Sequence, residues 1–266
     1  MGTLPVIVGG YRGRVPLVAA SVCPHPPMLV PEVASGAAPE LDDLRAACAL
    51  AVRHLLDANP RSVLVIGSGS SLTTWHGPVT ASFAPFGVPL DITLERATAV
   101  ASRPMPVSLL VATWLLREVD ASVEISLRSV PENLPPALCA RWRPEANGPG
   151  RQLFNDAQPW ALLVMGDGSA CRTQKAPGYL DPRAEAFDET VAEALAAADM
   201  DTLLRLNPAL AAELWCAGRA PWQVLAGLVD ADGRPWTGEV RYNDFPQGVT
   251  YLVATLAPTG GPTPNS

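Results

Sequence analysis

The sequence has few basic side chains and no long apolar run. Its 19 lysines and arginines are outnumbered by 26 aspartates and glutamates, and Lys175 is the only lysine. The net charge is −7 and the isoelectric point is near 5.0. A protein that follows a phosphate backbone needs a basic face, so we expect no nucleic-acid partner.

No stretch approaches the roughly 20 apolar residues of a membrane span. Residues 1–14 lack the pattern of a secretory signal, so we expect no membrane partner and a cytoplasmic protein.

Several chemical motifs are also missing. The cysteines Cys23, Cys48, Cys139, Cys171 and Cys216 are widely spaced and form no CxxC pair. This indicates reduced thiols rather than a disulfide framework or a structural zinc site. The glycine-rich stretch GSGSS, residues 67–71, is followed by no Gly-Lys-Ser/Thr and lacks GxGxxG spacing. Gly-x-Ser-x-Gly is absent as well, so a phosphate-binding loop, a dinucleotide site and a serine hydrolase are all disfavoured.

What the sequence does have is enough apolar content for a large core. It is 48% hydrophobic, with a mean hydropathy of +0.16. We predict one α/β domain over residues 15–257, with a mostly parallel central sheet flanked by helices. Residues 1–14 form an N-terminal segment and residues 258–266 a flexible tail. The order strand 15–22, helix 36–60, strand 62–71 and the continuous apolar run VLVI predict a parallel arrangement with both faces of the sheet covered. Residues 72–103 have no clear periodicity and are predicted to be a long functional loop.

Three predicted strands end in conspicuous loops: CPHPP, GSGSS and GDGSACR. Ligands bind outside the carboxyl ends of strands in open α/β sheets, so these loops are expected to converge on one crevice. His25, held between prolines, is the strongest candidate as a metal ligand or base, the alternative being a turn histidine. The other candidates are the hydroxyls of Ser68 and Ser70, which are equally consistent with an ordinary turn, and Asp167, Arg172 and Lys175, which would hold a carboxylate or phosphate or simply be solvated.

The segments CPHPPMLVPEV, VLVIGSGSS and GDGSACRTQKAPGYLDPRAEAFDETVAEALAAADMDTLLRLNP together resemble the class III extradiol ring-cleavage dioxygenases, the LigB-like proteins, and the related Memo group. The resemblance runs from about residue 15 to residue 257. It implies an α/β domain that binds Fe(II) through two histidines and a carboxylate, with a further histidine as acid/base. Such a triad leaves coordination positions open for substrate and O₂. His25 matches the first histidine of the family.

The sequence departs from the family pattern at the other positions. Members typically carry Ser-Pro-His where this chain has Gly67-Ser68-Gly69, so the second ligand is missing unless His76 supplies it. Ala170 stands where many members carry the acid/base histidine. For the last ligand the resemblance offers Glu213 or Cys216, which are three residues apart and are predicted to share a helical face. The metal candidates are therefore His25, His76 and Glu213, and we expect Fe(II) to be absent or weakly held.

These observations predict a degenerate member of the resembled family. The expected crevice is formed by His25, Ser68, Ser70, Asp167, Ser169 and Glu213, with Arg172, Lys175 and Cys216 as further ligand-binding residues. Its expected role is to bind a small anionic or phenolic molecule without ring cleavage. Two alternatives stay open: an active Fe(II) dioxygenase that uses His25, His76 and Glu213, and a non-enzymatic interaction protein. A homo-oligomer is compatible with any of the three.

Overall fold

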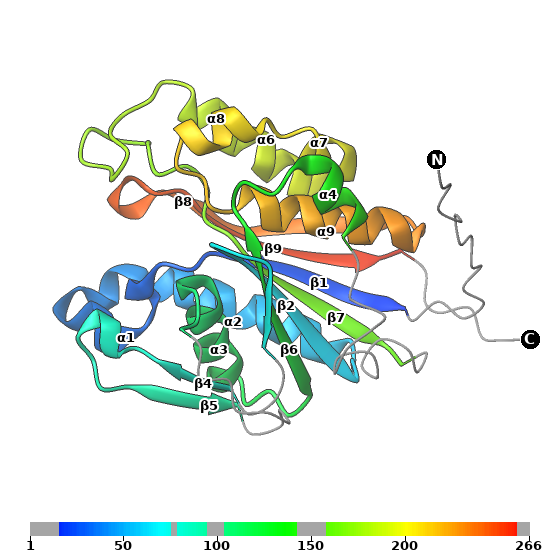
Figure 1. Cartoon of the computed structure of the whole chain (residues 1–266), viewed down its shortest axis with the longest axis horizontal. Coiled ribbons are helices and arrows are strands. Elements are labelled where there is room, and N and C mark those ends of the chain that lie inside the picture. Colours follow the sequence, from blue (N-terminus) through cyan, green and yellow to red (C-terminus); the bar gives the residue numbers. More distant parts are fainter. Residues whose placement is uncertain (1–15, 76–78, 95–103, 143–157, 260–266) are drawn as a thin grey trace, which may run out of the picture.

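The computed structural model describes residues 16–75, 79–94, 104–142 and 158–259. The predicted N-terminal segment 1–14, His76 and most of the predicted tail lie outside these ranges. The strands are β1 (Leu17–Cys23), β2 (Ser62–Gly69), β3 (Thr73–Trp75), β4 (Val79–Ser82), β5 (Asp91–Leu94), β6 (Glu124–Pro131), β7 (Trp160–Met165), β8 (Trp236–Asp244) and β9 (Tyr251–Pro258). Seven of them form one sheet in the order β3-β6-β2-β7-β1-β9-β8, and β4 and β5 form a separate pair (Figure 1).

The central sheet is mixed, which corrects the prediction of a mostly parallel sheet. Strands β6, β2, β7 and β1 are parallel to one another, as predicted for β1 and β2, but β7 lies between β1 and β2. Strands β9, β8 and β3 are antiparallel and occupy the two edges. Antiparallel strands need only a short connection, and residues 245–250 supply it between β8 and β9. An apolar run in the sequence does not carry this information about strand direction.

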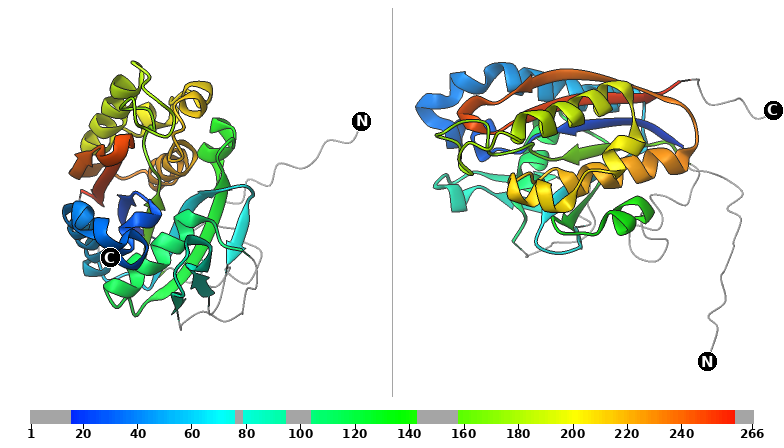
Figure 2. Two further views of the ribbon diagram at one scale, coloured as in Figure 1. Left: turned by 90° about the vertical axis from the view of Figure 1, so that its left-hand side faces the viewer. Right: turned by 90° about the horizontal axis from the view of Figure 1, so that it is seen from above.

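Helices cover both faces of the sheet. They are α1 (Pro31–Ala34), α2 (Asp42–Asp57), α3 (Val107–Glu118), α4 (Pro136–Arg141), α6 (Ala184–Ala197), α7 (Met200–Leu204), α8 (Pro208–Glu213) and α9 (Arg219–Asp232). Helices α2 and α3 lie on one face, and α4, α6, α7, α8 and α9 lie on the other (Figures 1 and 2). Among the described residues, no helix has the length and apolar character needed to cross a bilayer.

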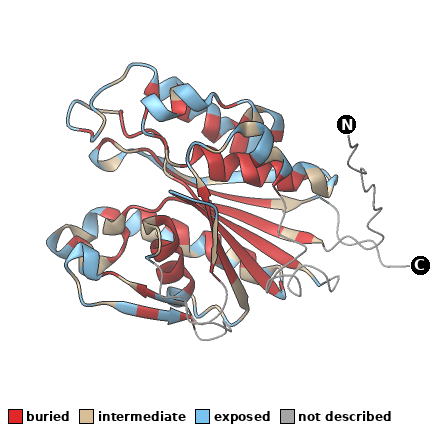
Figure 3. Ribbon diagram, in the orientation of Figure 1, coloured by how far each residue is buried: buried red, intermediate tan, exposed pale blue. Residues whose placement is uncertain are grey.

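The core consists of two apolar layers, one on each face of the sheet. In β7, Leu162 and Val164 pack against the layer that contains α6 and α9, while Leu163 and Met165 pack against the layer that contains α2 and α3. This two-sided burial explains the continuous apolar run WALLVM, because a strand covered on both faces shows no polar alternation. The central strands are therefore the most deeply buried part of the molecule (Figure 3).

Residues 72–103 contain regular structure that the sequence does not predict. Strand β3 extends the sheet beside β6, and β4 and β5 pair as an antiparallel ribbon. These strands are only three or four residues long, which is too short for an alternating pattern to be recognised. Residues 76–78 and 95–103, which belong to the predicted functional loop, lie outside the described ranges.

We predict that the protein loses stability as the pH rises above about 9. Burial raises the pKa of the Cys48 thiol well above its ordinary value of 9.0, and the neighbouring Cys23 adds to this effect. Above that value an unfolded chain releases the thiol proton while the folded chain retains it, so the free energy of unfolding falls. Urea unfolding at pH 7 and pH 10 measures the loss. The loss is expected to be smaller in Cys48→Ala, and an equal loss in both proteins would contradict the assignment.

Candidate functional site

The candidate site lies where β1 and β7 end. These strands are parallel neighbours with Cys23 opposite Met165, and β2 lies on the other side of β7. The backbone N–H of Gly166 donates to the carbonyl of Cys23 at 2.9 Å. Two of the three loops that the sequence predicts to converge are thus joined directly where their strands end.

His25 and Asp167 form a side-chain pair across these two loops. The backbone N–H of His25 donates to Asp167 Oδ1 at 2.7 Å. The same carboxylate oxygen lies 3.6 Å from His25 Nδ1, and the two side chains are 6% and 17% exposed. At that distance the ring nitrogen has no direct hydrogen bond. His25 Nδ1 is buried and has no partner among the described residues.

The geometry favours one tautomer of the imidazole. A nearby carboxylate stabilises a proton on the nitrogen that faces it, so Asp167 favours the Nδ1–H form of neutral His25. In that form Nε2 carries the lone pair and is able to accept a hydrogen bond or bind a metal. The pair is therefore suited to accept a proton or a hydrogen bond.

In the loop after β7, residues held by their backbone N–H groups alternate with residues held by their side chains. The backbone N–H groups of every second residue donate to neighbouring segments: Gly166 to Cys23, Gly168 to Thr250, Ala170 to Leu214 and Arg172 to Gly248, at 2.8–3.1 Å. The side chains of the intervening residues contact other groups: Asp167 contacts His25, Ser169 contacts Asp188, and Cys171 donates to the carbonyl of Leu214. The loop therefore continues strand-like pairing past the end of β1 and reaches the segment that leads into β9.

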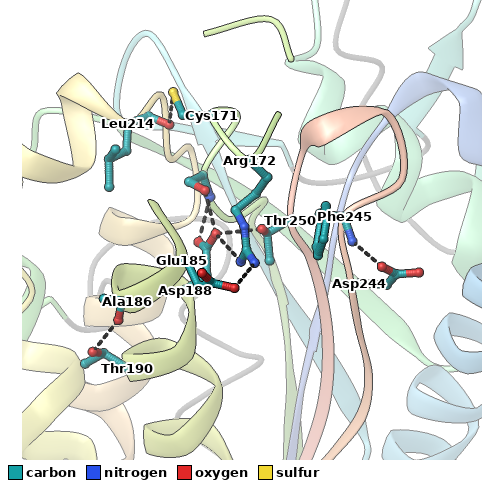
Figure 4. A network of polar contacts seen from close by, with 11 residues as sticks. Cys171, Arg172, Glu185, Ala186, Asp188, Thr190, Leu214, Asp244, Phe245 and Thr250 are labelled. Carbon is teal, nitrogen blue, oxygen red and sulfur yellow. Dashed lines mark hydrogen bonds and ion pairs between the residues drawn. The ribbon is translucent and has the colours of Figure 1, made fainter. Parts of the chain in front are cut away.

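A buried carboxylate that the sequence prediction missed lies beneath this loop. Asp188 of α6 is 1% exposed. It accepts hydrogen bonds from Ser169 N at 2.8 Å, Ser169 Oγ at 2.5 Å and Thr250 Oγ1 at 2.6 Å (Figure 4). Ser169 is fully buried in this contact, so its role is structural and it does not line an open crevice. Asp188 lies four residues after Ala184 and seven before Leu195, in the apolar stripe of α6. A carboxylate in such a stripe is the sequence signal that would have identified it.

The cationic residues expected to hold an anion are placed elsewhere. Arg172 Nη1 lies 3.5 Å from Asp188 and Nη2 lies 3.1 Å from Glu185. The Arg172 guanidinium also lies 4.4 Å from the centre of the Phe245 ring (Figure 4). Lys175 is exposed. The charge of Arg172 is thus directed at two carboxylates rather than at a ligand.

Two buried groups near the pair have raised pKa values. Burial raises the pKa of Tyr251, and the charge of Asp167 raises it further. Burial likewise raises the pKa of Cys216, with a further contribution from Asp188. Both groups therefore stay neutral over the physiological range.

Among the described residues, Ser68 and Ser70 form no hydrogen bond with this pair. Ser68 is buried in β2, and its carbonyl accepts a hydrogen bond from Ser108 Oγ at 2.6 Å. Ser70 lines a cavity of about 470 Å³ at the ends of β2 and β6, together with Met105, Pro106 and Ser129. Neither His25 nor Asp167 is part of its wall. The residues expected in one crevice are thus distributed over separate places.

The prediction that Glu213 and Cys216 share a helical face is wrong. Helix α8 ends at Glu213, and Trp215 has a φ of 54°, which interrupts the helix before Cys216. Glu213 is exposed and its carboxylate lies 2.7 Å from Arg183 Nη1. Cys216 is buried, and its Sγ lies 3.4 Å from the carbonyl oxygen of Asp167. Cys216 therefore supports the backbone beneath the pair, whereas Glu213 belongs to a surface ion pair.

The described residues do not assemble a metal-binding set. Within the described ranges, no group of three or more His, Cys, Asp and Glu side chains is arranged to hold a metal ion. His25 has Asp167 beside it, Glu213 is paired with Arg183, and His76 lies outside these ranges. The remaining described histidine, His54 in α2, has its Nε2 3.2 Å from the carbonyl oxygen of Leu256. These donors do not fit the iron triad that the sequence resemblance implies.

Comparisons with known proteins support the fold alone. No family model matches the sequence, and no curated protein matches it. Among solved structures, the chain is similar to the crystal structure of uncharacterized protein JW3007 from Escherichia coli K12. The two are 12% identical with a TM-score of 0.51, and the match covers 90% of this chain and 99% of that chain. At this identity the likeness shows a shared α/β architecture and leaves the chemistry open.

We predict that Gly168→Ala destabilises the protein by about 1–3 kcal/mol, because overpacking of a close contact has a cost of this size. A Cβ at this position would lie 2.8 Å from Thr250 Cβ and 2.9 Å from Asp188 Oδ1. Gly36→Ala is the matched control, since its Cβ would meet nothing within 4 Å. Urea unfolding measures both changes. Equal stability of the two variants would show that the loop has room to move.

Proposed function

We propose that the chain is a LigB-like protein with an incomplete metal site. In this proposal it binds a small phenolic molecule at His25 and Asp167 and does not cleave the ring. The observation that carries the proposal is the buried imidazole of His25, held with its Nδ1 3.6 Å from a carboxylate at the joined ends of two parallel strands. Ligand sites in open α/β sheets occupy this position.

Phenolic chemistry fits the pair better than anionic chemistry. A neutral imidazole with its Nε2 lone pair free accepts a hydrogen bond from an acidic hydroxyl, and phenols are strong donors of this kind. The charge of Asp167 stabilises the imidazole when it takes a share of the proton, whereas the same charge repels an anion. The engagement of Arg172 by Asp188 and Glu185 points the same way.

Exposed aromatic side chains on neighbouring loops support an aromatic ligand. Trp215 is 61% exposed and Tyr179 is 60% exposed. Both have positive φ values, 54° and 62°, which are strained for bulky residues. Such strain concentrates at functional sites. Trp215 directly precedes Cys216, which contacts the backbone of Asp167. In this proposal the two exposed rings are candidates to contact an aromatic ligand.

Metal-dependent ring cleavage, the first alternative, would require rearrangement. Glu213 would have to leave its ion pair with Arg183. Ala170, whose position matches the acid/base histidine of the resembled family, has no side-chain donor or acceptor. The proposal therefore assigns no step to iron. The second alternative, an interaction protein whose crevice binds nothing, predicts that no small phenol stabilises the fold.

We predict that catechol and phenol stabilise the protein against heat, whereas benzoate and inorganic phosphate do not. A ligand at 100 times its dissociation constant adds about 2.7 kcal/mol to the free energy of unfolding. Removal of the acceptor in His25→Ala is expected to weaken catechol binding about tenfold, the effect of losing one hydrogen bond to a buried group. Glu213→Gln is the control and should bind catechol normally. The proposal fails if benzoate and phosphate bind and the phenols do not.

We also predict that protein purified without chelators contains far less than one iron per chain and produces no ring-cleavage product from catechol with Fe(II) and O₂. Iron is measured by elemental analysis and the product by absorbance. A site that offers one imidazole holds a divalent transition metal weakly. Stoichiometric iron that disappears in His25→Ala and in Glu213→Gln would instead establish the dioxygenase alternative.

A further inference from the structure

We infer that Asp188 is the positioning residue for the site: it holds the loop after β7 so that Asp167 meets His25. The inference rests on the proposed function for its ligand-binding consequence, but its structural part concerns His25 alone. Asp188 itself contacts neither His25 nor Asp167 through any hydrogen bond that the described residues form. Its effect must therefore pass through Ser169 and Thr250.

Asp188 joins the two segments that cross the end of β1. Its Oδ1 accepts the backbone N–H of Ser169, and its Oδ2 accepts the hydroxyls of Ser169 and Thr250 (Figure 4). Ser169 and Thr250 are also hydrogen-bonded to each other, because Thr250 N donates to the carbonyl of Ser169 at 2.8 Å. Asp188 thus holds both members of a backbone pair from the side of α6.

The hydrogen bonds of Asp188 with Ser169 affect the position of Asp167 because Gly168, the residue between Asp167 and Ser169, is closely packed. Gly168 lies between Asp167 and Ser169, and its N–H donates to the Thr250 carbonyl at 2.8 Å. A Cβ at Gly168 would come within 3.0 Å of Asp188 and of Thr250. A displacement of Ser169 therefore moves Gly168 and, with it, the carboxylate that accepts the His25 N–H.

The donors around Asp188 match the two acceptor oxygens of a carboxylate. Three N–H and O–H groups of Ser169 and Thr250 point at its two oxygens, and the Arg172 guanidinium, 3.5 Å away, supplies the opposite charge. An asparagine has the same shape but turns an NH₂ group toward part of this donor set, which breaks the pattern. A buried polar network with one wrong partner loses its preferred geometry.

Four substitutions separate positioning from general stability. Asp188→Asn changes the acceptor. Thr250→Val removes the hydroxyl but keeps the side-chain shape, and Thr250→Ser keeps the hydroxyl. Glu185→Gln alters the other carboxylate that contacts Arg172. Glu185 is exposed and does not contact Ser169. The readouts are the ¹⁵N chemical shifts of the His25 ring and the dissociation constant of catechol. The chain has three histidines, and the loss of signals in His25→Gln assigns those of His25.

We expect Asp188→Asn and Thr250→Val to shift the His25 ring signals toward a mixture of tautomers and to weaken catechol binding about tenfold, as removal of an outer partner does at other preorganised sites. Thr250→Ser and Glu185→Gln should match the wild type in both readouts. All spectra are recorded well below the unfolding temperature of each variant. If Asp188→Asn does not fold, the comparison of Thr250→Val with Thr250→Ser decides the question.

The outcomes distinguish this inference from the proposed function. If wild-type protein does not bind catechol, the proposed function fails, and the His25 ring signals alone still test the positioning role. If Thr250→Val and Thr250→Ser leave those signals identical to the wild type while Thr250→Val lowers the unfolding temperature, Asp188 is only a structural residue and the inference is overturned.

Discussion

The structure of the site depends on one crossing: the loop after β7 passes over the end of β1 and pairs with the residues that lead into β9. Strand β1 stops at Cys23, and beyond it the sheet would separate into two halves. The hydrogen bonds of Gly168 and Ser169 with Thr250 close this gap. His25 follows the end of β1 and therefore lies under the crossing, which explains why a loop histidine is buried. Its burial is a consequence of sheet topology.

The carboxylates of Asp167 and Asp188, at the crossing, differ in how fully their surroundings are hydrogen-bonded. Asp188 is 1% exposed and receives three hydrogen bonds from uncharged groups. Asp167 keeps 17% of its side-chain surface, and it accepts the His25 N–H while His25 Nδ1 beside it has no partner. A fully satisfied buried network rigidifies the fold, whereas an unsatisfied buried group marks a place where the fold has not been optimised for stability alone. Asp188 is thus the structural carboxylate of the two, and Asp167 is the one to which the proposed function assigns chemistry.

The sequence was sufficient to predict what local patterns encode. Apolar runs located β1, β2 and β7, and strand order placed their loops together, which made His25 and Asp167 recognisable candidates. It was insufficient where long-range contacts decide. The position of Asp188 in the apolar stripe of its helix indicates burial, but the sequence does not reveal that Ser169 and Thr250 are its partners. The helix predicted through Glu213 and Cys216 ends early because Trp215 adopts a left-handed conformation, which no pattern in an alanine-rich stretch announces.

The alternation along residues 166–172 explains how the loop after β7 can keep its shape when some of its side chains are replaced. Gly166, Gly168, Ala170 and Arg172 are held through backbone N–H groups, which every residue except proline provides. Ala170 stands where the resembled dioxygenases carry a histidine, yet its N–H still donates to Leu214. A side chain at this position is therefore replaceable without loss of the loop. Asp167 and Ser169, by contrast, act through their side chains, so the hydrogen bonds of the loop constrain these two residues.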